Sequence, residues 1–374
     1  MCSSIHSTGQ YAGQYTGRLQ FTRSPKCQES TSQQTRRTAR ALPALVIALA
    51  CSAFSPPPSR SQTFPLTDAK DLVLVNVKAD PVEYKDRKVV RITNDSEKDG
   101  FALLRGVDFQ DGTIEADIAL KITTPPGVRM PGFVGIAFRA QPDASRYELF
   151  YLRPGNSHAD DQAMRNHSVQ YVSEPDNGWY RLRRQWPWVY ESCAELQTET
   201  WMHVRIDAKG RSARLFINGS AQPSLTVDGL KVEDLRGGVA LWGYAGEEAY
   251  FSNLRITNAT PLSIKNGSDA AGTWQIKSAT DYGPVNGTLR LLRDGNKLTG
   301  AWSGDLGKDH PVTGTWRNGY VELTFGGDWP LDEKGTQTVP VVATFAGWFD
   351  GDAGSGRMKV EGRADGRWSA TRQP

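Results

Sequence analysis

Apolar and polar side chains alternate along most of the chain beyond residue 63. The alternation has a two-residue period in runs such as 71–77, 82–93, 100–109 and 112–122, and Lys, Asp, Gly and Asn turns separate these runs. A two-residue period bounded by turn residues predicts strands that bury one face. No run of twelve or more residues shows a convincing helical period, so the pattern predicts an all-β protein.

The clearest alternation runs from residue 132 to residue 171. Three strand-like segments, 132–140, 147–154 and 167–172, are joined by a tight turn and a polar loop. They interleave polar side chains with Phe and Tyr, which predicts one face on a core and a second face that can hold a ligand. The antiparallel arrangement and the turns about ten residues apart predict a β-sandwich over 63–259.

A second rhythm follows a polar linker at 260–270. Over 271–374 the short strands carry Gly-x-Trp or Gly-Trp elements and end at Asp-Gly or Asn-Gly turns, as in 287–304 and 311–325. This pattern predicts a chain of hairpins with an internal quasi-repeat and about eight strands. Eight strands close naturally into a small up-and-down barrel, whose interior fills with side chains or one small ligand.

Composition narrows the choice of partners. The chain has 374 residues, enough for two soluble domains, and its 44 basic residues nearly balance its 41 acidic ones. Because much of the basic excess lies in the first 60 residues, the folded part gives no electrostatic reason to expect a nucleic-acid partner. The folded part contains one cysteine, Cys193, which we expect to be an ordinary thiol without an internal disulfide framework.

The first 62 residues are predicted to be a leader with a secretory signal. Arg36, Arg37 and Arg40 precede an apolar run at 41–53, and prolines follow it. Such a run is too short to anchor a chain across a bilayer, so we expect a bacterial protein exported to the periplasm or beyond, with no transmembrane segment after cleavage. The alternative is a lipid anchor at Cys51.

The order of the strand motifs resembles that of the concanavalin A-like lectin/glucanase superfamily. The resemblance rests on the segments 112–120, 132–140, 148–156, 201–207, 213–219, 237–243 and 249–256. It is nearest to the bacterial laminin-G-like and 3-keto-disaccharide hydrolase-like domains. It implies a jelly-roll sandwich whose concave face binds or cleaves glycans in relatives. The C-terminal pattern resembles lipocalin- and avidin-like small barrels, and it implies no particular ligand.

The resemblance also directs attention to carboxylates. Retaining glucanases of the superfamily carry Glu-x-Asp-x-Glu on one strand face, whereas this chain has Glu115, Asp117 and then Ala119. Since that two-carboxylate motif is incomplete, a glycoside hydrolase is the alternative and not the main prediction. Glu148 matches an acidic residue of the 3-keto-disaccharide hydrolase-like strand, and it is the predicted catalytic residue if the chain is an enzyme.

Two sets of side chains compete for the ligand-binding face. Glu148 and Arg139 would offer sugar hydroxyls an acceptor and a forked donor. Tyr151 and Arg153 point to the opposite face from Glu148, because successive side chains alternate. The sequence leaves open which set lines the groove, and Gln170 on the next strand is a further candidate.

Aromatic and basic residues concentrate at 177–190. Exposed indoles offer flat faces to sugar C–H groups, and guanidinium groups donate to hydroxyls or carboxylates. The alternative is a long loop that folds its tryptophans back over the sandwich. The predicted ligand-binding residues are therefore Arg139, Glu148, Tyr151, Arg153, Gln170, Trp179, Arg181, Arg183, Trp186 and Trp188.

The sequence predicts no metal and no cofactor. His158, Asp160, Asp161 and His167 share one loop, but polar loop residues are more often solvated than ligating. The leading prediction is an exported carbohydrate-recognition protein that binds a polysaccharide or oligosaccharide on the concave face of the sandwich. The alternatives are a glycoside hydrolase or lyase, and an adhesion or scaffold module without a small ligand.

Overall fold

The computed structural model describes residues 61–374, apart from 97, 126, 234, 266 and 333–334. The predicted leader and Cys51 therefore lie outside the described residues, except for Ser61 and Gln62, which belong to the first strand. Within the described part of the chain, no helix is long and apolar enough to cross a membrane.

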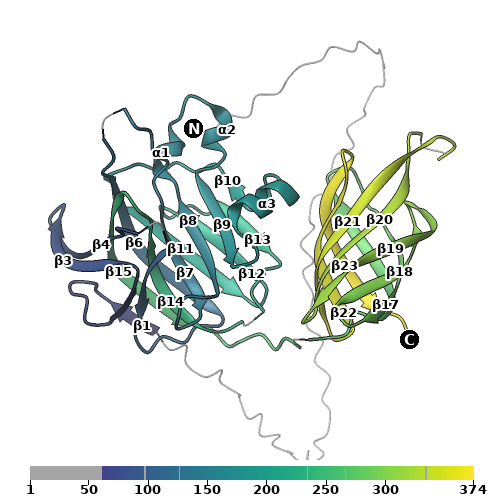
Figure 1. The fold of residues 1–374 in the computed structure, drawn as a ribbon, viewed down its shortest axis with the longest axis horizontal. Helices are drawn as coiled ribbons and strands as arrows, with labels where there is room; N and C mark the ends of the chain where they lie inside the picture. Colours follow the sequence, from purple (N-terminus) through teal and green to yellow (C-terminus); the bar gives the residue numbers. More distant parts are fainter. Residues whose placement is uncertain (1–60, 97, 126, 234, 266, 333–334) are drawn as a thin grey trace, which may run out of the picture. The chain divides into compact units, whose positions relative to one another are not determined.

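The first sheet of a β-sandwich, sheet A, contains eight antiparallel strands. Their order is β13-β12-β11-β6-β15-β4-β3, and β1 also pairs with β15. Figure 1 shows these strands following one another across the sandwich from β13 to β3. Their bounds are β1 (Ser61–Phe64), β3 (Lys78–Tyr84), β4 (Arg87–Thr93), β6 (Gly112–Ile122), β11 (Met202–Lys209), β12 (Ser212–Ile217), β13 (Leu225–Asp228) and β15 (Glu247–Asn258).

The second sheet, sheet B, contains seven antiparallel strands in the order β10-β9-β8-β7-β14-β5-β2. Their bounds are β2 (Leu72–Val75), β5 (Gly100–Leu104), β7 (Val134–Ala140), β8 (Tyr147–Leu152), β9 (Val169–Glu174), β10 (Glu191–Ser192) and β14 (Gly238–Gly243). Strands that are far apart in sequence are neighbours in both sheets, so the sandwich depends on long-range pairing.

Alternation divides the side chains of sheet B between two hydrophobic clusters. Phe138, Phe150 and Tyr171 belong to the main core between the sheets, together with Ile118 of sheet A. A separate cluster lies on the outer face of sheet B, and it includes Leu149, Tyr151, Val172 and Trp242. Both faces of sheet B are therefore covered, which explains why all residues of β7 and β8 are buried.

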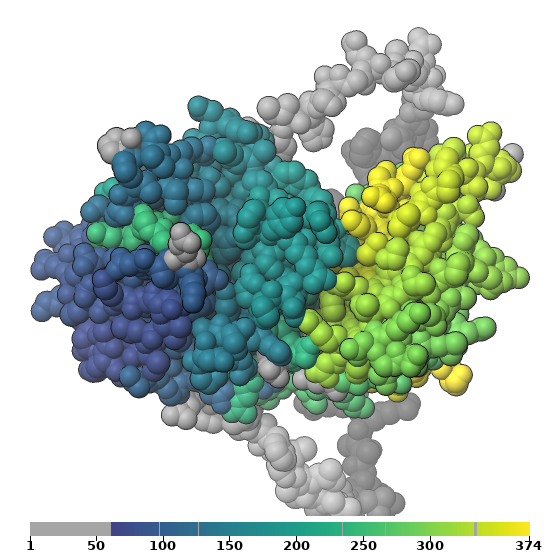
Figure 2. Space-filling view, in the orientation of Figure 1, coloured from purple at the N-terminus to yellow at the C-terminus, as the bar shows by residue number. Residues whose placement is uncertain are grey.

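The cover on the outer face includes the connections from β8 to β9 and from β9 to β10. They contain the helices α1 (Pro154–Ser157), α2 (Gln162–Arg165) and α3 (Trp179–Gln185), and Figure 1 shows α3 beside β9. In the space-filling view these teal connections are packed against the rest of the sandwich (Figure 2). The sequence did not predict α3, which follows Gly178 and ends just before Trp186 and Pro187, where proline disfavours a further helical turn.

The C-terminal strands form a closed eight-stranded antiparallel barrel, in which each strand pairs with the next and β23 pairs with β16. Trp274, Trp302, Phe345 and Trp368 belong to the cluster that fills it. The bounds are β16 (Gly272–Thr280), β17 (Gly287–Asp294), β18 (Lys297–Gly304), β19 (Gly307–Arg317), β20 (Tyr320–Pro330), β21 (Thr338–Asp350), β22 (Ala353–Val360) and β23 (Ala364–Arg372). The predicted fold class, an antiparallel sandwich followed by a small barrel, is confirmed.

One local expectation is wrong. We expected Cys193 to be an ordinary thiol, whereas it is disulfide-bonded in the structure. It directly follows the short strand β10. The sequence pattern gave no sign of this bond because no second cysteine lies in the part of the chain that was predicted to fold.

Candidate functional site

The outer face of sheet B holds a cavity of about 650 Å³. Strands β8, β9 and β14 contribute to it, as do α3 and several loops. The cavity falls in the size range of small-molecule sites in proteins. Its lining residues are Asp99, Pro131, Phe133, Leu149, Tyr151, Arg153, Asn156, Met164, His167, Val172, Glu174, Trp179, Arg183, Trp242 and Tyr244.

Strand alternation decides which side chains reach this cavity. Tyr151 of β8 lies opposite Gln170 of β9, and Tyr147 lies opposite Glu174. These four side chains share the outer face, whereas Glu148 projects to the other side of the sheet. Arg153 follows directly after β8 and continues the outer set.

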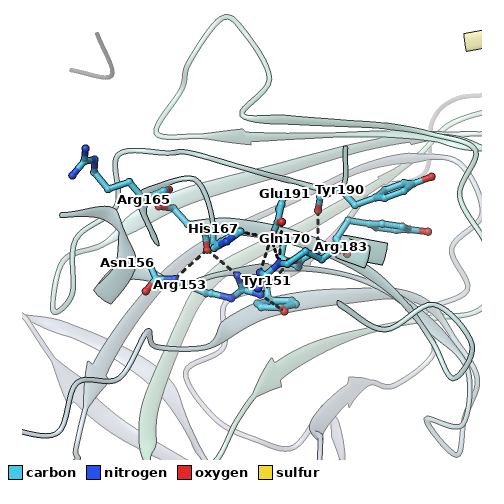
Figure 3. A network of polar contacts seen from close by, with 11 residues as sticks. Tyr151, Arg153, Asn156, Arg165, His167, Gln170, Arg183, Tyr190 and Glu191 are labelled. Carbon is cyan, nitrogen blue, oxygen red and sulfur yellow. Dashed lines mark hydrogen bonds and ion pairs between the residues drawn. The ribbon is translucent and has the colours of Figure 1, made fainter. Parts of the chain in front are cut away.

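Arg153 lies at one end of the cavity and is almost completely buried, with 5% of its surface exposed. Its guanidinium group donates to the carbonyl oxygen of His167 at 3.0 Å, the hydroxyl of Tyr151 at 2.7 Å and Oε1 of Gln170 at 3.1 Å (Figure 3). It also lies over the ring of Tyr151, 4.9 Å from the ring centroid. All three acceptors are uncharged, so these contacts position the guanidinium group without neutralising it.

A buried carboxylate, that of Glu191, pairs with Arg183 and His167 close to Arg153. Glu191, which is 3% exposed, accepts three hydrogen bonds of 2.7–3.2 Å from Arg183. His167 Nδ1 lies 2.7 Å from Oε2 of Glu191. Burial lowers the pKa of His167, and the Arg183 and Arg153 charges lower it further, although Glu191 opposes them. We therefore treat His167 as neutral at pH 7, and the Arg183 and Glu191 charges cancel each other.

The opposite end of the cavity is acidic. The Tyr147 hydroxyl donates to Asp99 at 2.6 Å. Burial raises the pKa of Glu174 to about 7, and the negative charges of Asp99 and Asp176 add to the effect. Glu174 lies four residues beyond Gln170 on β9, which is about 13 Å at the usual rise per residue of a strand. The cavity is thus polarised, with the guanidinium group of Arg153 at one end and carboxyl groups at the other.

Aromatic rings line the space between these ends. The ring centroids of Tyr151 and Trp242 are 5.2 Å apart, and those of Phe133 and Tyr244 are 5.4 Å apart. Trp179 of α3 is 47% exposed and completes the lining. The site therefore combines flat apolar surfaces with hydrogen-bonding groups.

Trp188 extends the aromatic surface beyond the cavity lining. It is 58% exposed and stacks on His167 with an angle of 6° between the ring planes. Its φ angle of 66° is unusual for a bulky residue, and such backbone strain tends to occur at functional sites.

Four of the predicted ligand-binding residues, Tyr151, Arg153, Trp179 and Arg183, line the cavity. Gln170 supports them through its bond to Arg153. The sequence had left open which face of β8 would be used, and the outer set is the one that meets the cavity.

The prediction that Arg139 and Glu148 form a pair in the groove is wrong. Both side chains are 0% exposed. Arg139 donates to Gln110 and pairs with Asp111 at 3.1 Å, while Glu148 accepts bonds from the Tyr171 hydroxyl and the Val232 amide. The physical reason is that Glu148 lies on the face of β8 that is packed against sheet A, so it cannot contact a ligand in the cavity.

The remaining residues of 177–190 separate into different environments. Trp186 is 4% exposed and belongs to the main core, so the alternative of a tryptophan folded over the sandwich describes this residue. Arg181 donates to both carboxylate oxygens of Glu322 at 2.8 and 3.0 Å. Only Trp179 and Arg183 of this segment line the cavity.

The other carboxylate and histidine candidates lie elsewhere. Glu115 and Asp117 are on the outer face of sheet A, where Asp117 pairs with Arg87 and His203 at 3.0 Å each. His158 lies 3.3 Å from Glu195. Within the described ranges, no group of three or more His, Cys, Asp or Glu residues could hold a metal ion.

Sequence reasoning missed Asp99, Glu174, Trp242 and Tyr244. Alternation could have found Glu174, because continuing the outer set of β9 from Gln170 leads through Val172 to Glu174. Asp99 carried no such signal, because it precedes β5 and reaches the cavity only through the strand order of sheet B.

No protein family profile matches the chain, and no curated protein sequence matches it. Among solved structures, the chain is similar to the carbohydrate-binding module CBM66 from Bacillus subtilis, with 15% identity over 50% of this chain and 95% of that one (TM-score 0.36). It is also similar to the exoplasmic domain of VIP36 bound to Ca²⁺ and Man3GlcNAc, with 8% identity over 54% and 90% (TM-score 0.38). A third is the Bacillus licheniformis β-glucanase, with 10% identity over 55% and 100% (TM-score 0.35).

Proposed function

We propose that this protein is an exported carbohydrate-binding protein that holds a polysaccharide or oligosaccharide segment in the cavity on the outer face of sheet B. The observation that carries the proposal is the lining of that cavity. Aromatic rings from Phe133, Tyr151, Trp242 and Tyr244 alternate there with hydrogen-bonding side chains.

This combination suits the two kinds of surface that a sugar presents. The C–H faces of a pyranose ring pack against aromatic faces, while its hydroxyl groups need donors and acceptors at fixed positions. Asn156 and Arg183 offer donors and Asp99 and Glu174 offer acceptors. Arg183 is fixed by Glu191, so part of the site is ordered before a ligand arrives, which lowers the entropic cost of binding.

The test is affinity electrophoresis of the purified protein through gels that contain neutral or acidic polysaccharides, followed by analysis of the eluted glycan for shortening. Retardation without shortening is the expected result. Failure to be retarded by any glycan in a broad panel would overturn the proposal and favour an adhesion or scaffold module.

A matched pair of variants locates the binding surface. Trp179→Ala removes an exposed ring that lines the cavity, and we expect about tenfold weaker retention. Tyr282→Ala is the control, because the ring of Tyr282 is 72% exposed but does not line the cavity. Equal retention by both variants would show that the sugar binds elsewhere.

A glycoside hydrolase is the second candidate, and one observation favours it. The cavity contains two carboxyl groups, Asp99 and Glu174, and the raised pKa of Glu174 is suited to a general acid near neutral pH. In that case Glu174 would take the role predicted for Glu148. Shortening of the glycan by the wild type, and its loss in Glu174→Gln, would identify hydrolysis.

A further inference from the structure

We infer that the sugar held in the cavity carries a carboxylate that binds at Arg153, with an uncharged sugar next to it that extends towards Glu174. The ligand class is therefore a glycan in which a uronate residue adjoins neutral residues. This inference rests on the proposed carbohydrate-binding function and makes it more specific.

The first argument is the uncompensated charge of Arg153. Its side chain is 5% exposed, yet its partners are a carbonyl, a hydroxyl and an amide oxygen. Among the described residues, no carboxylate lies within ion-pair distance of this guanidinium group. A buried charge without a counter-charge is costly, and a ligand anion in the cavity would supply what the protein does not.

A second buried arginine, Arg139, has the counter-charge that Arg153 lacks within the described part of the chain. Arg139 is 0% exposed, and it pairs with the carboxylate of Asp111 at 3.1 Å in addition to its bonds to a carbonyl oxygen. Arg153 has the carbonyl contact but lacks the carboxylate.

Glu191, which lies opposite Gln170 on the neighbouring strand, does not serve as the missing counter-charge. Glu191 already receives three hydrogen bonds from Arg183, and His167 lies against it at 2.7 Å. With His167 neutral, Arg153, Arg183 and Glu191 sum to one positive charge at this end of the cavity. One monoanionic group balances that sum, and the three hydrogen bonds of Arg153 leave its Nε–H and one Nη1–H to donate to such a group.

The acidic end of the cavity disfavours a ligand with a second carboxylate close to the first. The backbone of Glu174 lies about 13 Å along β9 from that of Gln170, which accepts a hydrogen bond from Arg153. Glu174 and Asp99 both line the cavity. They would repel a second carboxylate there, whereas the hydroxyl groups of a neutral sugar can donate to them. A chain with a uronate at every position therefore fits less well than one with a single uronate among neutral residues.

The main test compares two probes that differ in one functional group. The first is a xylo-oligosaccharide that bears one glucuronic acid, and the second is the same oligosaccharide after its carboxyl group has been reduced to the alcohol. Titration calorimetry with the wild-type protein at pH 7.5 should give at least tenfold tighter binding of the acidic probe, the usual effect of hydrogen bonds to a charged group. Oligomannuronate of equal length should bind more weakly than the acidic probe.

The possible outcomes separate the inference from the proposed function. Equal affinity for the acidic and reduced probes would overturn the carboxylate assignment and leave carbohydrate binding intact. Preference for a sulfated oligosaccharide over the uronate probe would also overturn it. If the protein bound no glycan at all, both the carboxylate assignment and the proposed carbohydrate-binding function would be wrong.

Variants assign the effect to Arg153. In Arg153→Gln the preference for the acidic probe should disappear, whereas Arg153→Lys, which keeps the charge but has fewer N–H donors, should retain part of it. Arg184→Gln is the control, because Arg184 is an exposed arginine of α3 that does not line the cavity. If Arg153→Gln fails to fold, the probe comparison on the wild type still decides the question, and persistence of the preference in a folded Arg153→Gln would contradict the inference.

Discussion

The two faces of sheet B carry polar side chains from the same pair of strands, β8 and β9. The polar groups on the two faces differ in their hydrogen-bond partners. On the inner face, Glu148 accepts bonds from the Tyr171 hydroxyl and the Val232 amide, and that hydroxyl in turn accepts from the Lys231 amide. On the outer face, Arg153 has only uncharged acceptors. The inner polar groups are hydrogen-bonded to one another. On the outer face, the charge of Arg153 is not balanced by a carboxylate of the described residues, so a ligand can balance it.

Burial alone does not separate a structural polar group from a functional one. Arg139 and Arg153 are both at most 5% exposed. The informative difference is the partner set, because a buried group whose charge is balanced stabilises the fold and leaves no capacity for a ligand. The same criterion distinguishes Glu148, with its two donors, from Glu174.

The largest expected effect is on stability, from a change on the inner face. Glu148→Ala leaves the Tyr171 hydroxyl and the Val232 amide without their acceptor, so we expect the free energy of unfolding to fall by about 3 kcal/mol. Urea unfolding measures this loss. The folded fraction should bind glycans as the wild type does. A loss of affinity without a loss of stability would contradict the structural role of Glu148.

The next effect concerns the outer carboxyl group and pH. The folded-state pKa of Glu174 is raised from 4.5 to about 7, mainly by burial. Between these values the folded state keeps the proton that the unfolded state has lost, so the free energy of unfolding falls as the pH rises from about 4.5 to 7. Because Glu174 is partly exposed, we expect a loss of only about 1 kcal/mol.

Urea unfolding of the wild type and Glu174→Gln at several pH values isolates this contribution. The variant should lose less stability across that interval. The comparison with the variant is needed because burial also raises the pKa of Glu247, to about 8, and this group produces a decline of the same sign. Parallel curves for the two proteins would show that ionisation of Glu174 does not affect stability.

The smallest effect is expected on the outer face of sheet A, which serves as a reference for both faces of sheet B. Asp117 pairs with Arg87 and His203 at a partly exposed position. Asp117→Asn should reduce the free energy of unfolding by less than about 1 kcal/mol, as is usual for exposed ion pairs. Glycan retention should not change, and a clear decrease would mean that the ligand also contacts sheet A.

The sequence predicted the structure best where a local rule relates residue spacing to the backbone. The two-residue period predicted the strands of both the sandwich and the barrel, and it showed that Tyr151 and Arg153 lie on the opposite face from Glu148. The concentration of indoles and guanidinium groups at 177–190 led to Trp179 and Arg183, which line the cavity.

The sequence alone determined the all-β class, the order of sandwich and barrel, and the division of each strand into two faces, because these follow from spacing along a pleated backbone. Only the tertiary structure decided which face of β8 is covered by sheet A and which meets a cavity. Alternation defines two faces of a strand but does not say which face will be covered. Long-range pairing decides this, because it brings Asp99, Trp242 and α3 close to β8 and β9. The same pairing placed Glu148 in the interior and left the charge of Arg153 facing the cavity.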